Sequence, residues 1–358
     1  MDPRIESAIA HWGSRLIANG IDYNDFRATT GRLQSWDRWC VEWSRTAARH
    51  EALARQAEER GSRVSAAEAN VRAALCYHFG KFVFFEDMDQ YRAASASTAE
   101  RYRRACEWLD PPAEAVDIPY AGALLPGYLR KPLGVERPPV AVIICGLDSV
   151  KEEMHTLEPL FHRRGMATLT FDGPGQGESE ALPIEPAFEK VVSAILHWLG
   201  GRRDVDGARV GAAGVSLGGY YAARAAAFEP RLTCAAAIGG PYDFGAIWDE
   251  LPGHTQNAVR LRSHAPDQET ARGKAEELTL KDAAHRIEMP FLTIFGRQDR
   301  LIPPAQAERL HAEMPSSAKR LVMYEEGTHV CNNMPFAWRP LVSDWMAGHL
   351  DARPTVPG

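Results

Sequence analysis

The spacing of apolar residues changes once along the chain, close to residues 110–115. Before this point apolar positions recur every three or four residues, which is the period of an amphipathic helix. One such stripe consists of Trp36, Trp39, Cys40, Trp43 and Ala47. Another consists of Ala99, Tyr102, Cys106 and Leu109 and stops at Pro111-Pro112. The pattern predicts an all-helical N-terminal domain over residues 1–112.

After Pro112 the apolar residues gather into short runs of strand length. A hairpin is predicted at Val116–Tyr120 and Leu124–Leu129, and further strands at Val140–Cys145, Ala167–Phe171, Val210–Val215, Cys234–Ile238, Phe291–Phe295 and Leu321–Tyr324. A helix is predicted over Glu152–Arg164, between the strands Val140–Cys145 and Ala167–Phe171. Strands that alternate with helices form a mostly parallel sheet with helices on both faces. We therefore predict an α/β domain over residues 113–358.

One stretch of this second domain, residues 244–280, has no clear period and separates two predicted strands. It is longer than an ordinary connection between elements, and long connections often serve as lids or binding segments. We expect it to be an inserted cap segment at the functional edge of the sheet.

A G-x-S-x-G pentapeptide, Gly214-Val215-Ser216-Leu217-Gly218, lies between a predicted strand and a helical run, Leu217–Phe228. This context is typical of a nucleophile elbow, in which a sharp strand-to-helix turn exposes a serine hydroxyl. The turn is crowded, so the positions beside the serine must be small. The pattern predicts Ser216 as a nucleophile.

Serine needs a neighbouring base and a group that orients the base. In elbow enzymes these partners follow in the order serine, acid, histidine. Asp299 comes just after the predicted strand Phe291–Phe295, and His329 follows the last predicted strand. Alone, Asp299 is better explained as a turn residue or helix N-cap, and His329 is only one of 12 histidines. Together and in this order they predict His329 as the base and Asp299 as the residue that orients it.

A nucleophilic serine also needs donors for the negative charge that develops on the attacked oxygen. The backbone N–H of Leu217 follows the serine directly, and we expect Leu147, in the loop after Val140–Cys145, to supply the second N–H. Cys145 ends a buried strand and is expected to pack. Asp172 begins a Gly-rich turn without the lysine of a P-loop or dinucleotide glycine spacing, so we expect it to be structural and predict no cofactor.

The composition excludes several classes of partner. The 358 residues carry a formal charge of −6, which gives no reason to expect nucleic acid or an anionic membrane. The N-terminus lacks the apolar core of a signal peptide, and no apolar run reaches the length of a spanning helix. Six scattered cysteines without C-x-x-C pairs argue against a zinc site or a disulfide framework. We expect a cytoplasmic, metal-free protein with a small-molecule substrate.

The motifs together resemble an α/β-hydrolase over about residues 113–350. Matching segments are Gly146-Leu147-Asp148-Ser149, Phe171–Ser179, Gly214–Gly218, Asp299 and Gly327-Thr328-His329. The helical N-terminal region, together with G-L-D-S-x-K-E-E (Gly146–Glu153) and H-V-C-N-N (His329–Asn333), narrows the likeness. The chain resembles the group that contains 2,6-dihydroxypseudooxynicotine hydrolase, fungal polyketide-shortening hydrolases of pigment pathways and FrsA-type esterases.

This resemblance implies a serine hydrolase that cleaves a carbon–carbon bond next to a ketone, with a helical lid domain and a homodimeric assembly. A carboxylesterase, an acyltransferase or cyclase, and a non-catalytic binding protein stay open as alternatives. In this group an acidic residue of the cap segment handles substrate, which points to Glu250, or else Asp249, against the alternative of a solvated helix end. The aromatic cluster with Tyr77, His78 and Phe82 could line a pocket, although core packing is the simpler interpretation.

Overall fold

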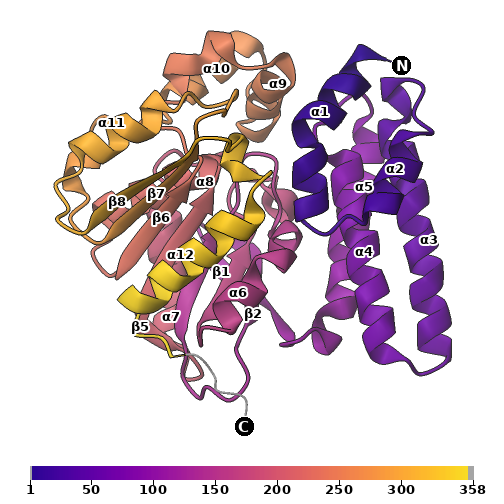
Figure 1. Cartoon of the computed structure of the whole chain (residues 1–358), viewed down its shortest axis with the longest axis horizontal. Coiled ribbons are helices and arrows are strands. Elements are labelled where there is room, and N and C mark those ends of the chain that lie inside the picture. The colour runs from indigo at the N-terminus through magenta and orange to yellow at the C-terminus, as the bar shows by residue number, and fades with distance from the viewer. Residues whose placement is uncertain (1, 354–358) are drawn as a thin grey trace. The chain divides into compact units, whose positions relative to one another are not determined.

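Five α-helices precede the first strand in the structure, a computed structural model that describes residues 2–353 (Figure 1). They are α1 (Pro3–Ala18), α2 (Tyr23–Thr30), α3 (Trp39–Glu59), α4 (Arg63–Lys81) and α5 (Met88–Ala105), with the 3₁₀ turns η1 (Trp36–Arg38) and η2 (Cys106–Trp108). The predicted N-terminal helical region is thus confirmed. Trp39 and Trp43 are buried as the stripe requires, and the indole N–H of Trp39 donates to the carbonyl of Phe79 on α4.

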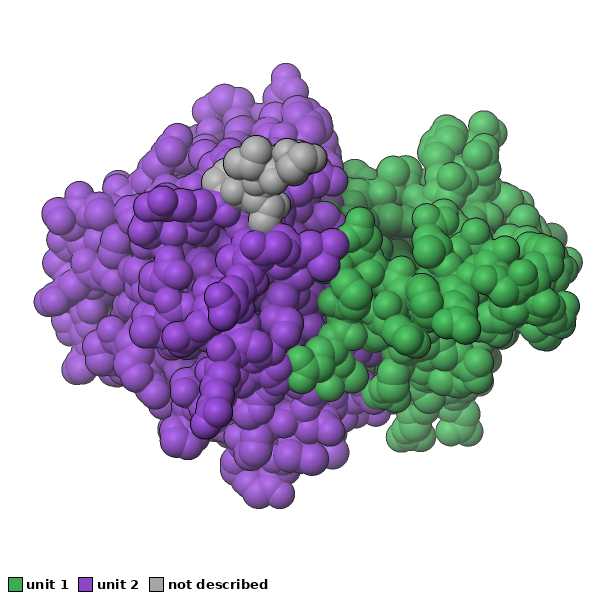
Figure 2. Space-filling view, turned by 90° about the horizontal axis from the view of Figure 1, so that it is seen from below, with its two compact units in different colours: residues 1–115, 152–157 green, residues 116–151, 158–358 purple. Residues whose placement is uncertain are grey.

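The chain divides into two compact units, which Figure 2 distinguishes by colour. The helical unit comprises the residues up to Ala115 together with Glu152–Leu157. The sheet unit comprises Val116–Lys151 and the chain from Glu158 onward.

The sheet unit contains eight strands in the order β1-β2-β4-β3-β5-β6-β7-β8. Their bounds are β1 (Ala113–Tyr120), β2 (Ala123–Arg130), β3 (Pro139–Ile144), β4 (Ala167–Phe171), β5 (Asp206–Val215), β6 (Cys234–Ile238), β7 (Phe291–Gly296) and β8 (Lys319–Tyr324). β2 runs antiparallel to β4, and every neighbouring pair from β4 to β8 is parallel. The predicted mostly parallel sheet is confirmed, and its carboxyl ends from β3 to β8 share one edge.

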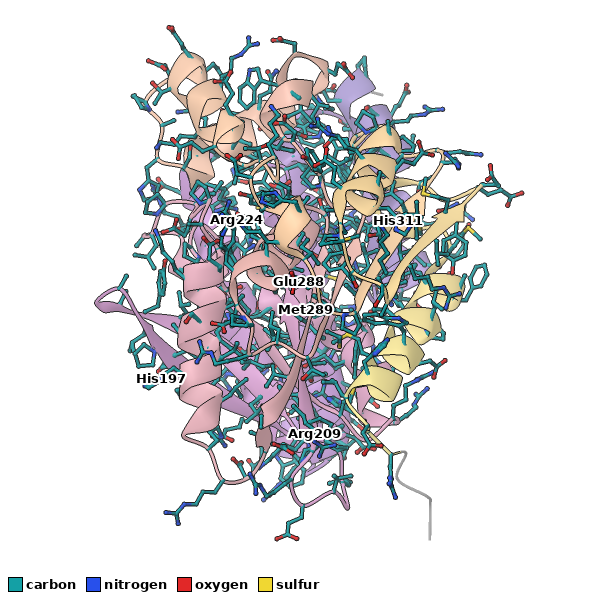
Figure 3. All side chains as sticks on the ribbon, turned by 90° about the vertical axis from the view of Figure 1, so that its left-hand side faces the viewer. His197, Arg209, Arg224, Glu288, Met289 and His311 are labelled. Carbon is teal, nitrogen blue, oxygen red and sulfur yellow. The ribbon has the colours of Figure 1, made fainter. Side chains whose placement is uncertain are left out.

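Helices cover both faces of this sheet (Figure 1). They are α6 (Glu158–His162), α7 (Glu189–Gly200), α8 (Leu217–Phe228), α11 (Ala305–Glu313) and α12 (Pro335–His349). α6 and α12 contact each other, and α7 contacts α8. Arg224 of α8, labelled in Figure 3, forms a bidentate pair with Glu189 of α7 at 2.8 and 2.9 Å. The central strands β3, β6 and β7 are fully buried between these layers.

Two segments differ from the sequence-based expectation. Residues 244–280 are not irregular: they form the 3₁₀ segment η5 (Gly245–Glu250), α9 (Gly253–Arg262) and α10 (Gln268–Glu276). These helices are short and mostly polar, so they carry little periodic signal. The single helix expected over residues 152–164 is instead η3 (Lys151–Thr156) followed by α6, because Pro159 fits only the first turn of a helix and a new helix must begin there.

None of the helices in residues 2–353 has the length and apolarity that crossing a membrane requires.

Candidate active site

The predicted nucleophile elbow is a sharp turn at the junction of β5 and α8. Ser216 occupies it with φ 54° and ψ −127°, a conformation that non-glycine residues rarely adopt and that concentrates at functional sites. A Cβ on Gly214 would collide with the carbonyl oxygen of Gly218, and one on Gly218 would collide with that of Ile144. The chain therefore needs glycine at both positions to make the turn. The strained turn places Ser216 at the carboxyl edge of the sheet.

Ser216, His329 and Asp299, which we call the candidate triad, are joined by hydrogen bonds. Nε2 of His329 lies 2.9 Å from Oγ of Ser216, and Nδ1 lies 2.8 Å from Oδ2 of Asp299. The other carboxylate oxygen, Oδ1, accepts the backbone N–H groups of Leu301 and Ile302 at 2.9 and 3.0 Å. When Nδ1–H of His329 donates a hydrogen bond to the Asp299 carboxylate, Nε2 is left to accept a hydrogen bond from the hydroxyl of Ser216.

The loop that carries His329 is fixed from both sides. Oδ1 of Asn333 accepts the backbone N–H of Thr328 at 2.9 Å and its hydroxyl at 3.0 Å, and Nδ2 donates to the carbonyl of Glu326 at 2.7 Å. Val330 then adopts φ 57° and ψ 13°, an uncommon conformation for a β-branched residue. These contacts hold the imidazole in one orientation.

The two predicted oxyanion donors belong to segments that adjoin Ser216. Leu217 is the first residue of α8, where the N–H has no partner within the helix and the helix dipole favours negative charge. The loop after β3 approaches closely as well, because a Cβ on Gly146 would lie 3.0 Å from Cβ of Ser216. The N–H of the next residue, Leu147, donates to no other group of residues 2–353. An oxygen between these two donors would be stabilised as it became negative.

The predicted acidic residues of the cap segment are solvent-exposed. Asp249 and Glu250 end η5, and the side chain of Asp249 is 74% exposed and paired with Arg272 at 2.8 Å. This exposure and this surface ion pair are what a solvated helix end would show, which was the alternative to a role in substrate handling. A role in substrate handling stays a prediction for both residues.

The predicted aromatic residues of the helical unit have the contacts of core side chains. Phe82 packs edge-on against Trp12 at 5.1 Å between ring centroids. His78 is fully buried, and burial lowers its pKa to about 4 against the opposing effect of Glu153. Tyr77 is half-buried, which raises its pKa to about 12. A pocket-lining role for these three residues stays a prediction.

Sequence reasoning missed the polar cluster around His78. Glu153, fully buried in η3, accepts bonds from Arg15 at 2.7 and 2.8 Å, from Asn19 at 2.7 Å and from Nε2 of His78 at 3.0 Å. Burial alone would raise the pKa of Glu153, but the charge of Arg15 and the hydrogen bonds outweigh it and hold the pKa well below its usual value. The cluster therefore consists of an ionised carboxylate, its guanidinium counterion and a neutral imidazole.

A second buried ion pair joins the loops that follow β3 and β4. Nζ of Lys151 contacts Oδ2 of Asp172 at 2.6 Å and a carboxylate oxygen of Glu178 at 2.7 Å. Burial raises the pKa of Asp172, but the Lys151 charge and several hydrogen bonds bring it below its ordinary value. The structural interpretation of Asp172 thus agrees with its contacts. The motifs Gly146–Glu153 and Phe171–Ser179 contain these residues, although neither motif reveals that they meet.

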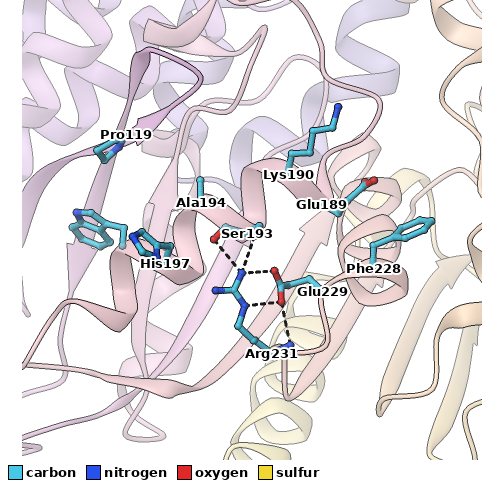
Figure 4. Close-up of a pocket in the computed structure, with 10 residues that line it drawn as sticks. Pro119, Glu189, Lys190, Ser193, Ala194, His197, Phe228, Glu229 and Arg231 are labelled. Carbon is cyan, nitrogen blue, oxygen red and sulfur yellow. Dashed lines mark hydrogen bonds and ion pairs between the residues drawn. The ribbon is translucent and has the colours of Figure 1, made fainter.

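A groove of about 650 Å³ lies elsewhere on the sheet unit, along α7 (Figure 4). Within it Arg231 is already bound, to Glu229 at 2.8 Å and to Oγ of Ser193 at 2.7 Å. None of the candidate triad residues lines this groove. The described residues 2–353 also contain no group of three or more His, Cys, Asp or Glu side chains placed to hold a metal ion.

The chain is similar to one known family and to several known proteins. The model of a family described as esterase FrsA-like matches residues 27–328. The chain is 33% identical to the 2,6-dihydropseudooxynicotine hydrolase of Paenarthrobacter nicotinovorans, over 99% of this chain and 96% of the relative. The α/β hydrolase xenA of Xenoacremonium sinensis is 30% identical over 65% of this chain, which spans 58% of that relative.

Solved structures give the same picture. The crystal structure of the 2,6-dihydroxy-pseudo-oxynicotine hydrolase superposes with a TM-score of 0.88 at 31% identity, covering 96% of this chain and 98% of the other. AbyA5 wild type superposes with a TM-score of 0.75 and covers 97% of both chains. At 19% identity the second likeness concerns the fold alone.

Proposed function

We propose a function from the premise that the chain belongs to the esterase FrsA-like family of α/β-hydrolases. The chain is a serine hydrolase that cleaves a carbon–carbon bond next to a ketone, in a β-diketone or aryl ketone of small-molecule metabolism. The observation that carries the proposal is the hydrogen-bonded series from Ser216 through His329 to Asp299 at the elbow. The similarity to a dihydropseudooxynicotine hydrolase along nearly the whole chain favours this substrate class.

The chemistry needs only the residues at this edge of the sheet. His329 accepts the hydroxyl proton as Oγ of Ser216 attacks the ketone carbon, and the oxyanion lies between the N–H groups of Leu147 and Leu217. The intermediate collapses, the carbon–carbon bond breaks, and its electron pair leaves as an enolate that the neighbouring carbonyl stabilises. Protonated His329 returns the proton to that carbon. Water, activated by His329, then hydrolyses the acyl-enzyme to a carboxylic acid.

A carboxylesterase is the second candidate, because the matching family is described as esterase-like. The same triad and donors would act, and only the leaving group would differ. An acyltransferase or cyclase would release the acyl group to a substrate nucleophile in place of water.

Product analysis in H₂¹⁸O tests the proposal. The wild-type enzyme should convert an aryl 1,3-diketone to a ketone and a carboxylic acid that contains one ¹⁸O atom, and Ser216→Ala should not. Much faster turnover of aryl esters, with negligible diketone cleavage, would favour the esterase. A product without ¹⁸O would point to acyl transfer or cyclisation.

The proposal also covers the substrate, the assembly and the location of the protein. We propose a small-molecule substrate, a homodimer as the family likeness suggests, and a cytoplasmic location. The cytoplasm is supported by the six cysteines, which are all buried and which form no disulfide within residues 2–353.

A further inference from the structure

A glutamine in the loop after β4 contacts the backbone of the oxyanion loop, which we define as residues 145–150. Gln176 is buried, and its Nε2 donates to two consecutive carbonyls, those of Cys145 at 2.9 Å and Gly146 at 2.7 Å. Its Oε1 accepts the backbone N–H of Gly173 at 2.9 Å. All three contacts fix the orientation of the amide, because exchanging its oxygen and nitrogen would oppose like groups at each contact.

The contact to Gly146 bears directly on the predicted oxyanion donor. The carbonyl of Gly146 and the N–H of Leu147 belong to one planar peptide group, in which the C=O and the N–H point in opposite directions. A donor that holds this carbonyl therefore also fixes the direction of the Leu147 N–H. The hydrogen bond polarises the peptide as well, which strengthens its N–H as a donor.

Lys151, the residue that directly follows the oxyanion loop, is held by the same neighbouring segment. Oδ1 of Asp172 accepts the backbone N–H of Lys151 at 3.0 Å, and Oδ2 contacts Nζ of Lys151. The loop is thus attached at both ends to the segment after β4. Gln176 is the attachment that reaches the donor peptide itself.

We propose that Gln176 is a positioning residue that presets the Leu147 N–H for the oxyanion, an inference that rests on the proposed serine hydrolase. It acts through the backbone and contacts no reacting atom. Its effect belongs to the transition state, where the oxygen becomes negative, and not to binding of the uncharged ground state.

Two substitutions of Gln176 test its donor and acceptor contacts separately. Gln176→Met keeps the approximate volume but removes both donors. Gln176→Glu keeps an acceptor for the Gly173 N–H but turns an oxygen toward the two carbonyls. Removing one oxyanion donor typically lowers kcat by about 10²–10³-fold. Misplacing the donor should lower kcat by about 10-fold or more, while KM for p-nitrophenyl butyrate stays within about threefold.

A matched control is available at the opposite edge of the sheet. Ser316 is also buried and also joins two backbone segments: its hydroxyl donates to the carbonyl of Met289 at 2.7 Å and accepts the N–H of Ala318 at 3.3 Å. Both contacts precede β7 and β8, on the side away from Ser216, and Figure 3 labels Met289. Ser316→Ala should lower the unfolding temperature but leave kcat unchanged.

The decisive experiment measures two quantities in the wild type and in both Gln176 variants: kcat, and the inhibition constant of an aryl trifluoromethyl ketone. This ketone forms an anionic hemiketal with the serine. The proposal predicts that both Gln176 variants weaken this inhibitor by the factor by which kcat falls. Unchanged kcat and inhibition in both variants, with an active wild type, would overturn the proposal for Gln176 alone. A wild type that neither turns over the ester nor binds the ketone would overturn the proposed function and this inference with it.

Discussion

Nε2 of His329 lies 2.9 Å from Oγ of Ser216, although 113 positions separate the two residues and their strands are not neighbours. Ser216 follows β5, whereas His329 follows β8 at the edge of the sheet. The loop after β8 reaches across the ends of β7 and β6, where a Cβ on Gly239 would lie 3.0 Å from the backbone nitrogen of Val330. The parallel sheet brings Ser216 and His329 together by aligning the strand ends.

Removing the hydroxyl of Ser216 should abolish turnover. Loss of the nucleophile in a serine hydrolase costs on the order of 10⁶ in kcat. Ser216→Ala keeps the strained backbone, so its thermal unfolding should match that of the wild type. Steady-state kinetics on the substrate of the wild type, beside a melting curve, checks both statements, and normal turnover would exclude Ser216 as the nucleophile.

Asp299→Asn should lower kcat by about 10⁴-fold with little change in KM, because an amide can hold the imidazole in the wrong tautomer. The two backbone N–H groups that bind Oδ1 would favour placing the amide oxygen there, which turns the NH₂ toward Nδ1. Pre-steady-state measurement of acylation tests this directly. A variant with normal acylation would mean that another carboxylate orients His329.

Glu153→Gln should destabilise the helical unit strongly. Removing one partner of a buried ion pair leaves the other charge uncompensated, at a cost of about 3–5 kcal/mol. Glu86→Gln is the matched control, because Glu86 pairs with Arg4 at the surface and such pairs contribute about 0–1 kcal/mol. Urea unfolding followed by circular dichroism compares them. Equal stability of the two variants would show that Glu153 and Arg15 do not depend on each other.

The lowered pKa of His78 predicts that the free energy of unfolding decreases in mild acid. Its pKa is about 4 in the folded chain against 6.5 ordinarily, so between these values the unfolded chain binds more protons. Stability is complete above pH 6.5 and falls as the pH drops toward 4. The difference between a pKa of 6.5 and one of about 4 corresponds to about 3 kcal/mol of stability.

The comparison with His78→Gln isolates this contribution, because glutamine can still donate to Glu153 and does not titrate near pH 5. The difference in unfolding free energy between wild type and variant, measured at several pH values, should change across this window. A constant difference from pH 7 to pH 4.5 would contradict a neutral, buried His78.

Much of the fold follows from the local pattern. The predicted strands Ala167–Phe171 and Cys234–Ile238 have the observed bounds of β4 and β6. A strand that is buried on both faces is a continuous apolar run, and such a run can be recognised in the sequence. The order of Ser216, Asp299 and His329 also predicted their meeting, since the topology aligns the ends of their strands. These predictions succeed because each uses either residues that are adjacent in sequence or residues that follow parallel strands and so reach the same sheet edge.

The polar contacts between distant segments could not be predicted in this way. Glu153 meets Arg15 and His78 across 138 and 75 positions, and no periodic pattern links residues so far apart. The role of Gln176 likewise depends on the loops after β3 and β4 lying side by side. The helices α9 and α10 could not be predicted because so few of their residues are apolar.

The most direct test of the account is covalent labelling of the wild-type chain with a serine-directed aryl phosphonate, followed by intact mass measurement and peptide mapping. The account predicts one phosphonyl group per chain, attached to Ser216, and no labelling of Ser216→Ala. An unlabelled wild type, or an adduct that persists in Ser216→Ala, would contradict it.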